Sequence, residues 1–256
     1  MFLALFVVFS FLNKAALAVD DNQALIVVRD SGNYPPYEFR NSRGQLVGVH
    51  GEILAELARQ TKTRLLIRDV PWKRALAMMQ DGRADILLYA RRTAERLAYM
   101  DFIEGTDLLS VNNSFFIQKD RQSDVLYDGA IESLRPYTIG VMRGFDYGGP
   151  INSTYGLKKD LTDNGVINLV RKLETGRIDV AIIDRNIVGY FQKEKLASPD
   201  LLPIGDVYRP IKIYMAVSKK SDRAREAYAF VRSIADFKKT EKYKEIMKKY
   251  QSYLKN

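Results

Sequence analysis

Arginines gather directly after a short apolar segment in the first half of the chain. Gly82 precedes the apolar run 86–89, Arg91 and Arg92 follow it, and Arg96 lies four residues further on. Ligands of α/β proteins bind beyond the carboxyl ends of parallel strands, so these side chains would lie at such a site. A guanidinium grips a carboxylate with two parallel hydrogen bonds. The pattern predicts a site for a ligand that carries a carboxylate.

The same arrangement occurs a second time. Residues 79–86 (MQDGRADI) and 173–180 (LETGRIDV) each place Gly-Arg between an expected helix and an expected strand. The apolar residues of both helices recur at the i, i+3, i+4, i+7 spacing of a helix packed on a core: Trp72, Ala75, Leu76 and Met79 in the first, and Val166, Leu169, Val170 and Leu173 in the second. The second strand, 180–183, ends at Asp184. If the two units face each other, a zwitterion fits between the arginines and this carboxylate.

The N-terminus has the pattern of a secretory signal. Residues 2–12 are apolar apart from Ser10, and 16–18 (ALA) form an A-x-A cleavage site. The apolar run is shorter than the roughly 20 residues that span a bilayer. We expect a signal peptide at 1–18, cleavage before Val19 and export to the periplasm. An uncleaved anchor or a buried N-terminal helix is the alternative.

Composition excludes several kinds of site. The chain has no cysteine, so disulfides, thiol nucleophiles and Cys-metal sites are absent. Its single histidine, His50, is interpreted as a loop or cap residue, and neither a metal nor a cofactor is expected. Much of the net charge of +9 lies in 218–256, which we interpret as a solvated helix face with Ile246 and Tyr250 turned inward. Attraction to an anionic membrane or a partner subunit is the alternative, and no nucleic-acid partner is expected.

Elements alternate along the chain. We expect strands at 24–28 and 64–70 and helices at 51–61 and 72–80, which predicts a mostly parallel sheet with helices on both faces. Strand-like segments at 110–118 and 211–218 flank a further α/β unit that begins at 137 and ends near 210. Two crossings with an α/β unit between them indicate an inserted second lobe.

Several short motifs occur in a characteristic order: Tyr34-Pro35-Pro36-Tyr37-Glu38-Phe39, 44–48 (GQLVG), 82–86 (GRADI), 93–96 (TAER), 101–102 (DF) and 176–179 (GRID). Together they resemble the bacterial extracellular solute-binding proteins of family 3. The resemblance implies the two-lobe α/β fold of type II periplasmic binding proteins, whose two crossing hinge strands let the lobes close on a ligand. It places lobe 1 at 19–112 and 213–256 and lobe 2 at 113–212. It also implies a monomer without catalytic activity that binds an amino acid or small carboxylate for the membrane permease of an ABC importer.

The resemblance assigns roles to four residues. Arg96 would hold the ligand α-carboxylate, Asp184 its amino group, and Tyr34 and Trp72 would flank its side chain. The alternatives are a surface arginine paired with a neighbouring carboxylate, a helix N-cap at Asp184 and core packing of Trp72. Tyr37 is expected to pack behind its loop.

Three residues depart from the family pattern. Arg91 stands where a Ser or Thr is usual near the carboxylate, Asp146 stands near another usual hydroxyl, and His50 replaces an acidic residue that usually precedes a helix. The glycine-containing loop 143–149 could bring backbone amides to an anion, or form an ordinary turn. If Arg91 and Arg143 both add positive charge to the cleft, a ligand with a second anionic group becomes plausible.

Two other functions stay open. One is a sensory subunit that presents its closed form to a membrane receptor. The other is a dehydratase-type enzyme on the same scaffold, for which Glu38 is the candidate acid or base. The chain has no G-x-S-x-G and no P-loop pattern, which leaves the enzyme without a familiar catalytic motif.

Overall fold

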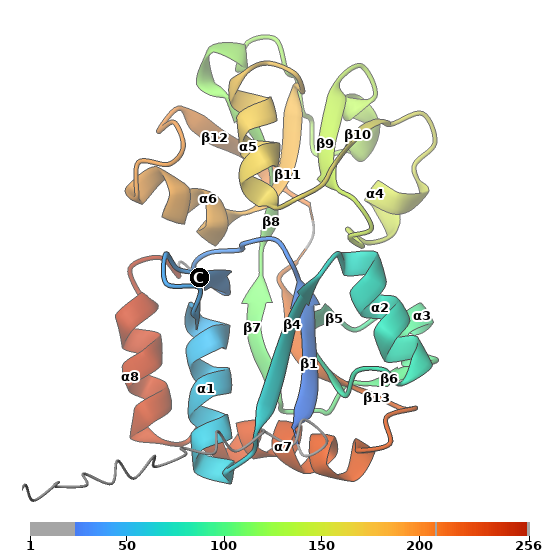
Figure 1. The fold of residues 1–256 in the computed structure, drawn as a ribbon. Helices are drawn as coiled ribbons and strands as arrows, with labels where there is room; N and C mark the ends of the chain where they lie inside the picture. The colour runs from blue at the N-terminus through green and yellow to red at the C-terminus, as the bar shows by residue number, and fades with distance from the viewer. Residues whose placement is uncertain (1–23, 208, 255–256) are drawn as a thin grey trace, which may run out of the picture.

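Two lobes are stacked one above the other in the computed structural model, which describes residues 24–207 and 209–254 (Figure 1). Each lobe is built on its own sheet. The expected signal peptide and its cleavage site before Val19 lie outside the described residues.

Lobe 1 contains a six-stranded sheet with a parallel half and an antiparallel half. Its strand order is β4 (Leu65–Val70), β1 (Leu25–Asp30), β5 (Ile86–Arg91), β13 (Ile211–Ser218) and β6 (Met100–Asp101), and β7 (Asp107–Val111) also pairs with β13. β1 runs parallel to β4 and β5, whereas β13 is antiparallel to its partners. The parallel half is the part predicted from the strand–helix alternation.

Helices cover both faces of this sheet, because its buried strands are apolar on both sides. One core cluster joins the sheet to α1 (Val49–Thr61), α7 (Ala224–Phe237) and α8 (Glu241–Tyr250). A second cluster joins it to α2 (Trp72–Asp81). The short helix α3 (Ala94–Leu97) follows β5, and β2 (Phe39–Arg40) with β3 (Leu46–Val47) forms a small ribbon.

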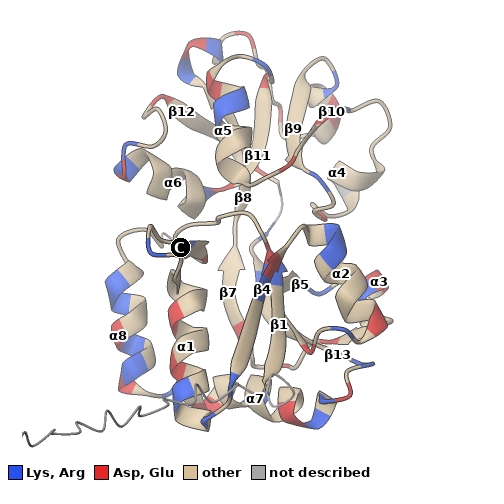
Figure 2. Ribbon diagram, in the orientation of Figure 1, with Lys and Arg blue, Asp and Glu red and all other residues tan. Residues whose placement is uncertain are grey.

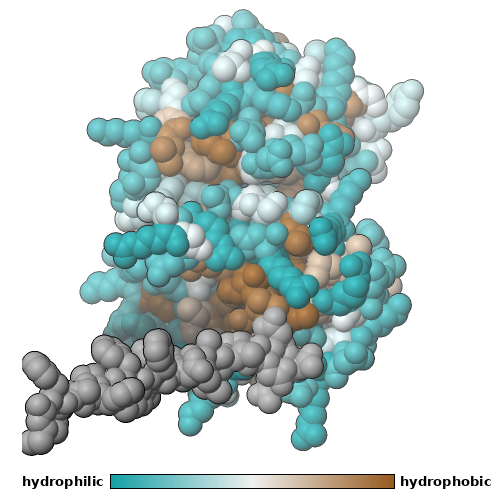
Figure 3. All heavy atoms as spheres, in the orientation of Figure 1, coloured by the Kyte–Doolittle hydropathy of each residue, from teal (hydrophilic) through white to brown (hydrophobic). Residues whose placement is uncertain are grey.

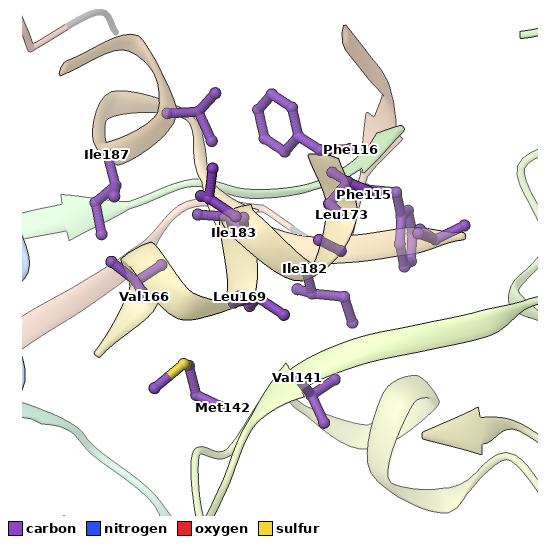
Figure 4. Packing of buried hydrophobic residues seen from close by; sticks show 14 of the residues in the cluster. Phe115, Phe116, Val141, Met142, Val166, Leu169, Leu173, Ile182, Ile183 and Ile187 are labelled. Carbon is purple, nitrogen blue, oxygen red and sulfur yellow. The ribbon is translucent and has the colours of Figure 1, made fainter. Parts of the chain in front are cut away.

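Lobe 2 contains a five-stranded sheet. Its order is β10 (Lys158–Thr162), β9 (Thr138–Met142), β11 (Val180–Asp184), β8 (Asn113–Gln118) and β12 (Leu201–Asp206). β9, β10 and β11 are parallel, and β8 is antiparallel to β11 and β12. The lobe also holds α4 (Gly149–Ser153), α5 (Val166–Glu174) and α6 (Arg185–Lys193), with 3-10 turns at Lys119–Arg121 and Ile131–Leu134. Figure 4 shows side chains of α5 packed among those of the sheet.

The chain crosses between the lobes twice, from β7 to β8 and from β12 back to β13 (Figure 1). The segment expected as one strand at 110–118 is therefore two strands in different sheets, separated by Asn112. Asn112 leaves the ladder because its N–H donates to Asp184 Oδ2 and its carbonyl accepts from Arg185 N–H. The expected lobe boundaries at 112/113 and 212/213 stay predictions.

The surface agrees with the interpretation of the basic C-terminal region. Ile246 and Tyr250 of α8 are buried, and Figure 2 shows the lysines of this helix along its outer side. Hydrophilic residues predominate on the face in Figure 3, with hydrophobic patches on both lobes. None of the helices in the described part of the chain is long and apolar enough to span a membrane.

Candidate ligand-binding cleft

A cleft lies between the two lobes, with an empty volume of about 820 Å³ that includes space open to solvent. Residues at the carboxyl ends of four parallel strands line it, namely Asp30 of β1, Arg91 of β5, Met142 of β9 and Asp184 of β11. Because parallel strands in an α/β sheet present their carboxyl ends to ligands, both lobes direct their binding edges into one space.

Arg96 is buried in the wall of this cleft. The side chain of Thr93 caps α3 by accepting a hydrogen bond from Arg96 N–H, so the cap fixes the backbone that carries the guanidinium. Arg96 is only 5% exposed, its Nη1 donates to the Arg91 carbonyl at 2.9 Å, and its guanidinium lies 5.1 Å from the Trp72 ring centroid. Burial lowers the pKa of Arg96, although a guanidinium stays charged in proteins. Arg96 is thus not the surface arginine that the alternative described.

Asp184 lies in the cleft wall and also caps α6. Its Oδ1 accepts hydrogen bonds from the N–H groups of Asn186 and Ile187 and from the Tyr37 hydroxyl, and its Oδ2 accepts from Asn112 N–H at 2.7 Å. Burial raises the pKa of Asp184 to about 6, and these hydrogen bonds oppose that rise. The N-cap alternative is confirmed. Since a carboxylate has about four acceptor sites, a ligand ammonium would find room chiefly at Oδ2.

Tyr37 connects the lobes. It lies in the loop before β2 in lobe 1, is fully buried, and stacks on His50 with ring centroids 5.4 Å apart. Its hydroxyl donates to Asp184 Oδ1 at 2.9 Å and accepts from Asn186 Nδ2 at 3.0 Å, both in lobe 2. Tyr37 is buried as expected, but its hydroxyl has an additional role as an interlobe link.

Three aromatic rings meet in the cleft. Phe145 of lobe 2 packs against Tyr34 and Trp72 of lobe 1, with centroid distances of 5.8 and 5.7 Å. The Tyr34 hydroxyl donates to Asp30 Oδ1, and Trp72 Nε1 donates to the Gly144 carbonyl at 3.0 Å across the lobes. Trp72 also belongs to the apolar core beneath α2, so it both packs in the core and lines the cleft.

Arg91 and Arg143, the two arginines expected to add positive charge to the cleft, lie in different surroundings. Arg91 lines the cleft, and its Nη1 lies 3.3 Å from the Asp146 carbonyl and 3.6 Å from Asp146 Oδ1. Asp146, which lines the cleft too, therefore offsets Arg91 from the opposite lobe. Arg143 does not line the main cleft; it is 44% exposed in its side chain and pairs with Asp163 at 2.9 Å. The expectation that both arginines add free charge to the cleft lacks support.

Sequence reasoning missed several lining residues, among them Asp30, Tyr89 and Asn113. Asp30 had a usable signal, because it lies two residues after the predicted strand 24–28 of the parallel sheet. Tyr89 had a weaker one, since it lies within the predicted strand 86–89.

Glu38 contributes a second buried carboxylate to the cleft. Arg29 Nε lies 3.3 Å from its Oε1, whereas Oε2 has no hydrogen-bond partner within the described residues. Burial raises the pKa of Glu38 to about 7. His50 Nδ1 lies 4.0 Å from Oε2, and burial lowers the pKa of His50 to about 3, so the imidazole is neutral. His50 lies inside α1, and no group of three metal-ligating side chains occurs in the described ranges.

Comparison with known proteins identifies the family. The family model of the bacterial extracellular solute-binding proteins, family 3, matches residues 26–253. The chain belongs to this family. It is 25% identical over 264 residues to the histidine-binding periplasmic protein of Escherichia coli strain K12, covering 97% of this chain and 94% of that protein. The histidine-binding periplasmic protein of Salmonella typhimurium is 24% identical over 233 residues, covering 85% of this chain and 84% of the relative.

Solved structures confirm the two-lobe fold. A mutant of the arginine-binding protein ArgBP from T. maritima superposes with a TM-score of 0.76 at 21% identity, covering 90% of this chain and 96% of that one. A histidine kinase sensor domain with similarity to periplasmic binding proteins superposes with a TM-score of 0.74 at 23% identity, covering 89% and 96%. An ancestral arginine-binding protein bound to glutamine gives 0.74 at 18% identity, covering 90% and 98%. At these identities the likeness concerns the fold alone.

Proposed function

We propose that this protein is exported and captures an amino acid between its lobes for delivery to the permease of an ABC importer. Arg96 would hold the ligand carboxylate, and Asp184 would accept a hydrogen bond from the ligand amine through Oδ2. The binding role itself requires no chemical change in the ligand. The names of the relatives, which include histidine- and arginine-binding proteins, support an amino acid as the ligand.

One observation carries this proposal: a buried guanidinium faces an interlobe cleft that also holds a buried carboxylate. Arg96 is bonded to a carbonyl and lies over an aromatic ring, and within the described residues no carboxylate forms a hydrogen bond with it. A buried charge is costly unless it is paired. A ligand carboxylate would supply that partner, and closure of the lobes would exclude water from the pair.

A thermal-shift screen of the common amino acids and small carboxylates tests the proposal. A ligand at about 100 times its Kd stabilises the folded state by about 2.7 kcal/mol. Calorimetric titration should then give one site per chain, and the ligand should be recovered unchanged after long incubation. Lack of stabilisation by every amino acid would contradict the proposal, and a ligand recovered as a dehydrated product would favour the dehydratase-type alternative.

A sensory role is the second candidate, and the likeness to a histidine kinase sensor domain favours it. Both roles use the same ligand-bound form, so a binding assay does not separate them. Uptake of labelled ligand in cells lacking the gene does: loss of uptake supports transport, whereas normal uptake with loss of a ligand-dependent transcriptional response supports sensing.

A further inference from the structure

A second, smaller chamber lies beside the main cleft. Its empty volume is about 510 Å³, which includes open solvent, and both lobes contribute to its walls. Lobe 1 provides Lys73, and lobe 2 provides Arg143, Thr162 and Asn164. The aromatic residues Tyr34, Trp72 and Phe145 line both spaces and so form a partition between them.

The wall of the chamber includes a buried threonine. Thr162, at the end of β10, is 3% exposed, and its Oγ1 is buried without a hydrogen-bond partner in the part of the chain that the structure describes. Buried polar side-chain atoms are nearly always hydrogen-bonded in folded proteins, so each exception calls for an explanation. A polar group of a ligand in this chamber would satisfy the hydroxyl.

Two cations and two carboxylates line the chamber, namely Lys73, Arg143, Asp30 and Asp163. Arg143 Nε is 2.9 Å from both carboxylate oxygens of Asp163, which compensate it. Asp30 Oδ1 already accepts from the Tyr34 hydroxyl and from Gly32 N–H. Lys73, in contrast, is exposed and pairs with no carboxylate within the described residues. Its ammonium is therefore the cation of this lining that has no ion-pair partner among the described residues, while the Asp30 carboxylate keeps its charge because both of its donors are neutral.

The backbone of lobe 2 adds partial positive charge on one side of the chamber. Asn164 of the chamber wall lies just before α5, whose N-cap is Gly165 and which therefore has no side-chain cap. The first amides of a helix carry partial positive charge and lack partners within the helix. The chamber thus combines a cationic side chain from one lobe with a hydroxyl and a helix start from the other.

We propose that the second chamber is an anion subsite for the far end of the ligand. Resting on the proposed amino-acid function, the inference names the ligand class: an amino acid whose extended side chain ends in a carboxylate or phosphate-like group. Its α-groups would lie at Arg96 and Asp184, and its side chain would pass the partition at Phe145. The second anionic group is thus recognised by Lys73 and Thr162 and not by Arg91.

Calorimetry with three amino acids of similar length tests the ligand class. L-2-Aminoadipate ends in a carboxylate, L-norleucine in a methyl group and L-lysine in an ammonium. We expect the parent protein to prefer aminoadipate to norleucine by about tenfold or more, which corresponds to about 1.4 kcal/mol. Lys73→Ala and the nearly isosteric Thr162→Val should each reduce that ratio, while Lys248→Ala on exposed α8 should leave it unchanged. A parent protein that prefers lysine or norleucine would overturn the inference.

A titration with inorganic phosphate tests the subsite without any amino acid. Phosphate should shift the amide NMR signals of Thr162 and Asn164 in the parent and in Lys248→Ala, and the shifts should be much smaller in Lys73→Ala. Parent signals that do not move, or that move equally in Lys73→Ala, would overturn the subsite. If phosphate binds in this way but every amino acid fails, the subsite stands and the proposed amino-acid function is wrong.

Discussion

Replacing Arg96 by alanine tests the centre of the proposed site. The guanidinium is 5% exposed, and a carbonyl and an aromatic ring are its partners. No carboxylate of the described residues forms an ion pair with it, so a bound ligand carboxylate would supply that pair in the dry cleft. Truncating one member of a buried, hydrogen-bonded charge pair costs about 2–5 kcal/mol of binding free energy. At about 1.4 kcal/mol per decade, this predicts a loss of affinity of about 30-fold to several thousand-fold.

The assay is calorimetric titration with the amino acid that the thermal-shift screen selects. Arg96→Lys keeps the charge but loses the planar fork, so it should bind with intermediate affinity. Arg83→Ala is the matched control, because Arg83 is 57% exposed in its side chain and pairs with Asp81 away from the cleft. Circular dichroism establishes that each variant is folded. A folded Arg96→Ala protein that binds within about threefold of the parent, a difference of about 0.65 kcal/mol, would refute the carboxylate site.

Three further predictions concern the contacts between the lobes and the buried carboxylates. Tyr37→Phe removes the hydroxyl that joins Asp184 to Asn186, and it should lower the free energy of unfolding in urea by about 1 kcal/mol or more. Tyr155→Phe, at a 92% exposed position, is the control and should leave this free energy unchanged. Equal stability of the two variants would contradict the link between the lobes. Gly32→Ala would place a Cβ 3.0 Å from Gly165 Cα of the other lobe and 2.7 Å from Asp30 Oδ1, so small-angle scattering should show a larger radius of gyration and titration a weaker affinity. Gly189→Ala, whose Cβ meets no atom within 4 Å, is the control, and an unchanged radius in Gly32→Ala would show that the lobes do not meet there. Burial raises the pKa of Glu38 to about 7 and that of Asp184 to about 6. The folded state therefore binds protons at these groups more tightly than the unfolded state does. We expect the free energy of unfolding to rise as the pH falls from about 7 to about 5. Urea midpoints across this range should vary less in Glu38→Gln, and an equal pH dependence in both proteins would mean that Glu38 does not titrate there.

Local patterns in the sequence were sufficient to predict the central elements. The helical periodicity predicts α2 and α5, and the apolar runs predict β5 and β11, because these segments bury one face or both. The edge strands of lobe 2 were missed for physical reasons. β10 reads KKDLT and is mostly exposed, while β12 reads LLPIGD and has a register shift between Pro203 and Gly205, so neither shows an alternating pattern.

The site was predictable where it depends on strand ends and unpredictable where it depends on how the lobes meet. Arg96 and Asp184 follow buried strands, and the structure places both in the cleft. The pairing of Arg91 with Asp146 and the reach of Tyr37 to Asp184 join residues far apart in the chain. No local spacing encodes such contacts, since they arise only when the two lobes are brought together.

The position of β13 in the lobe 1 sheet has a consequence for the order of folding. β13 lies between β5 and β6, and among the described residues it is the strand with which both β6 and β7 pair, although it is made only after the whole of lobe 2. Lobe 2, in contrast, completes its sheet from one continuous stretch of chain. Because long-range pairing is slow to form, the insert should acquire its structure first. Until the last quarter of the chain is present, β5 should keep an open edge that is prone to pair with another chain.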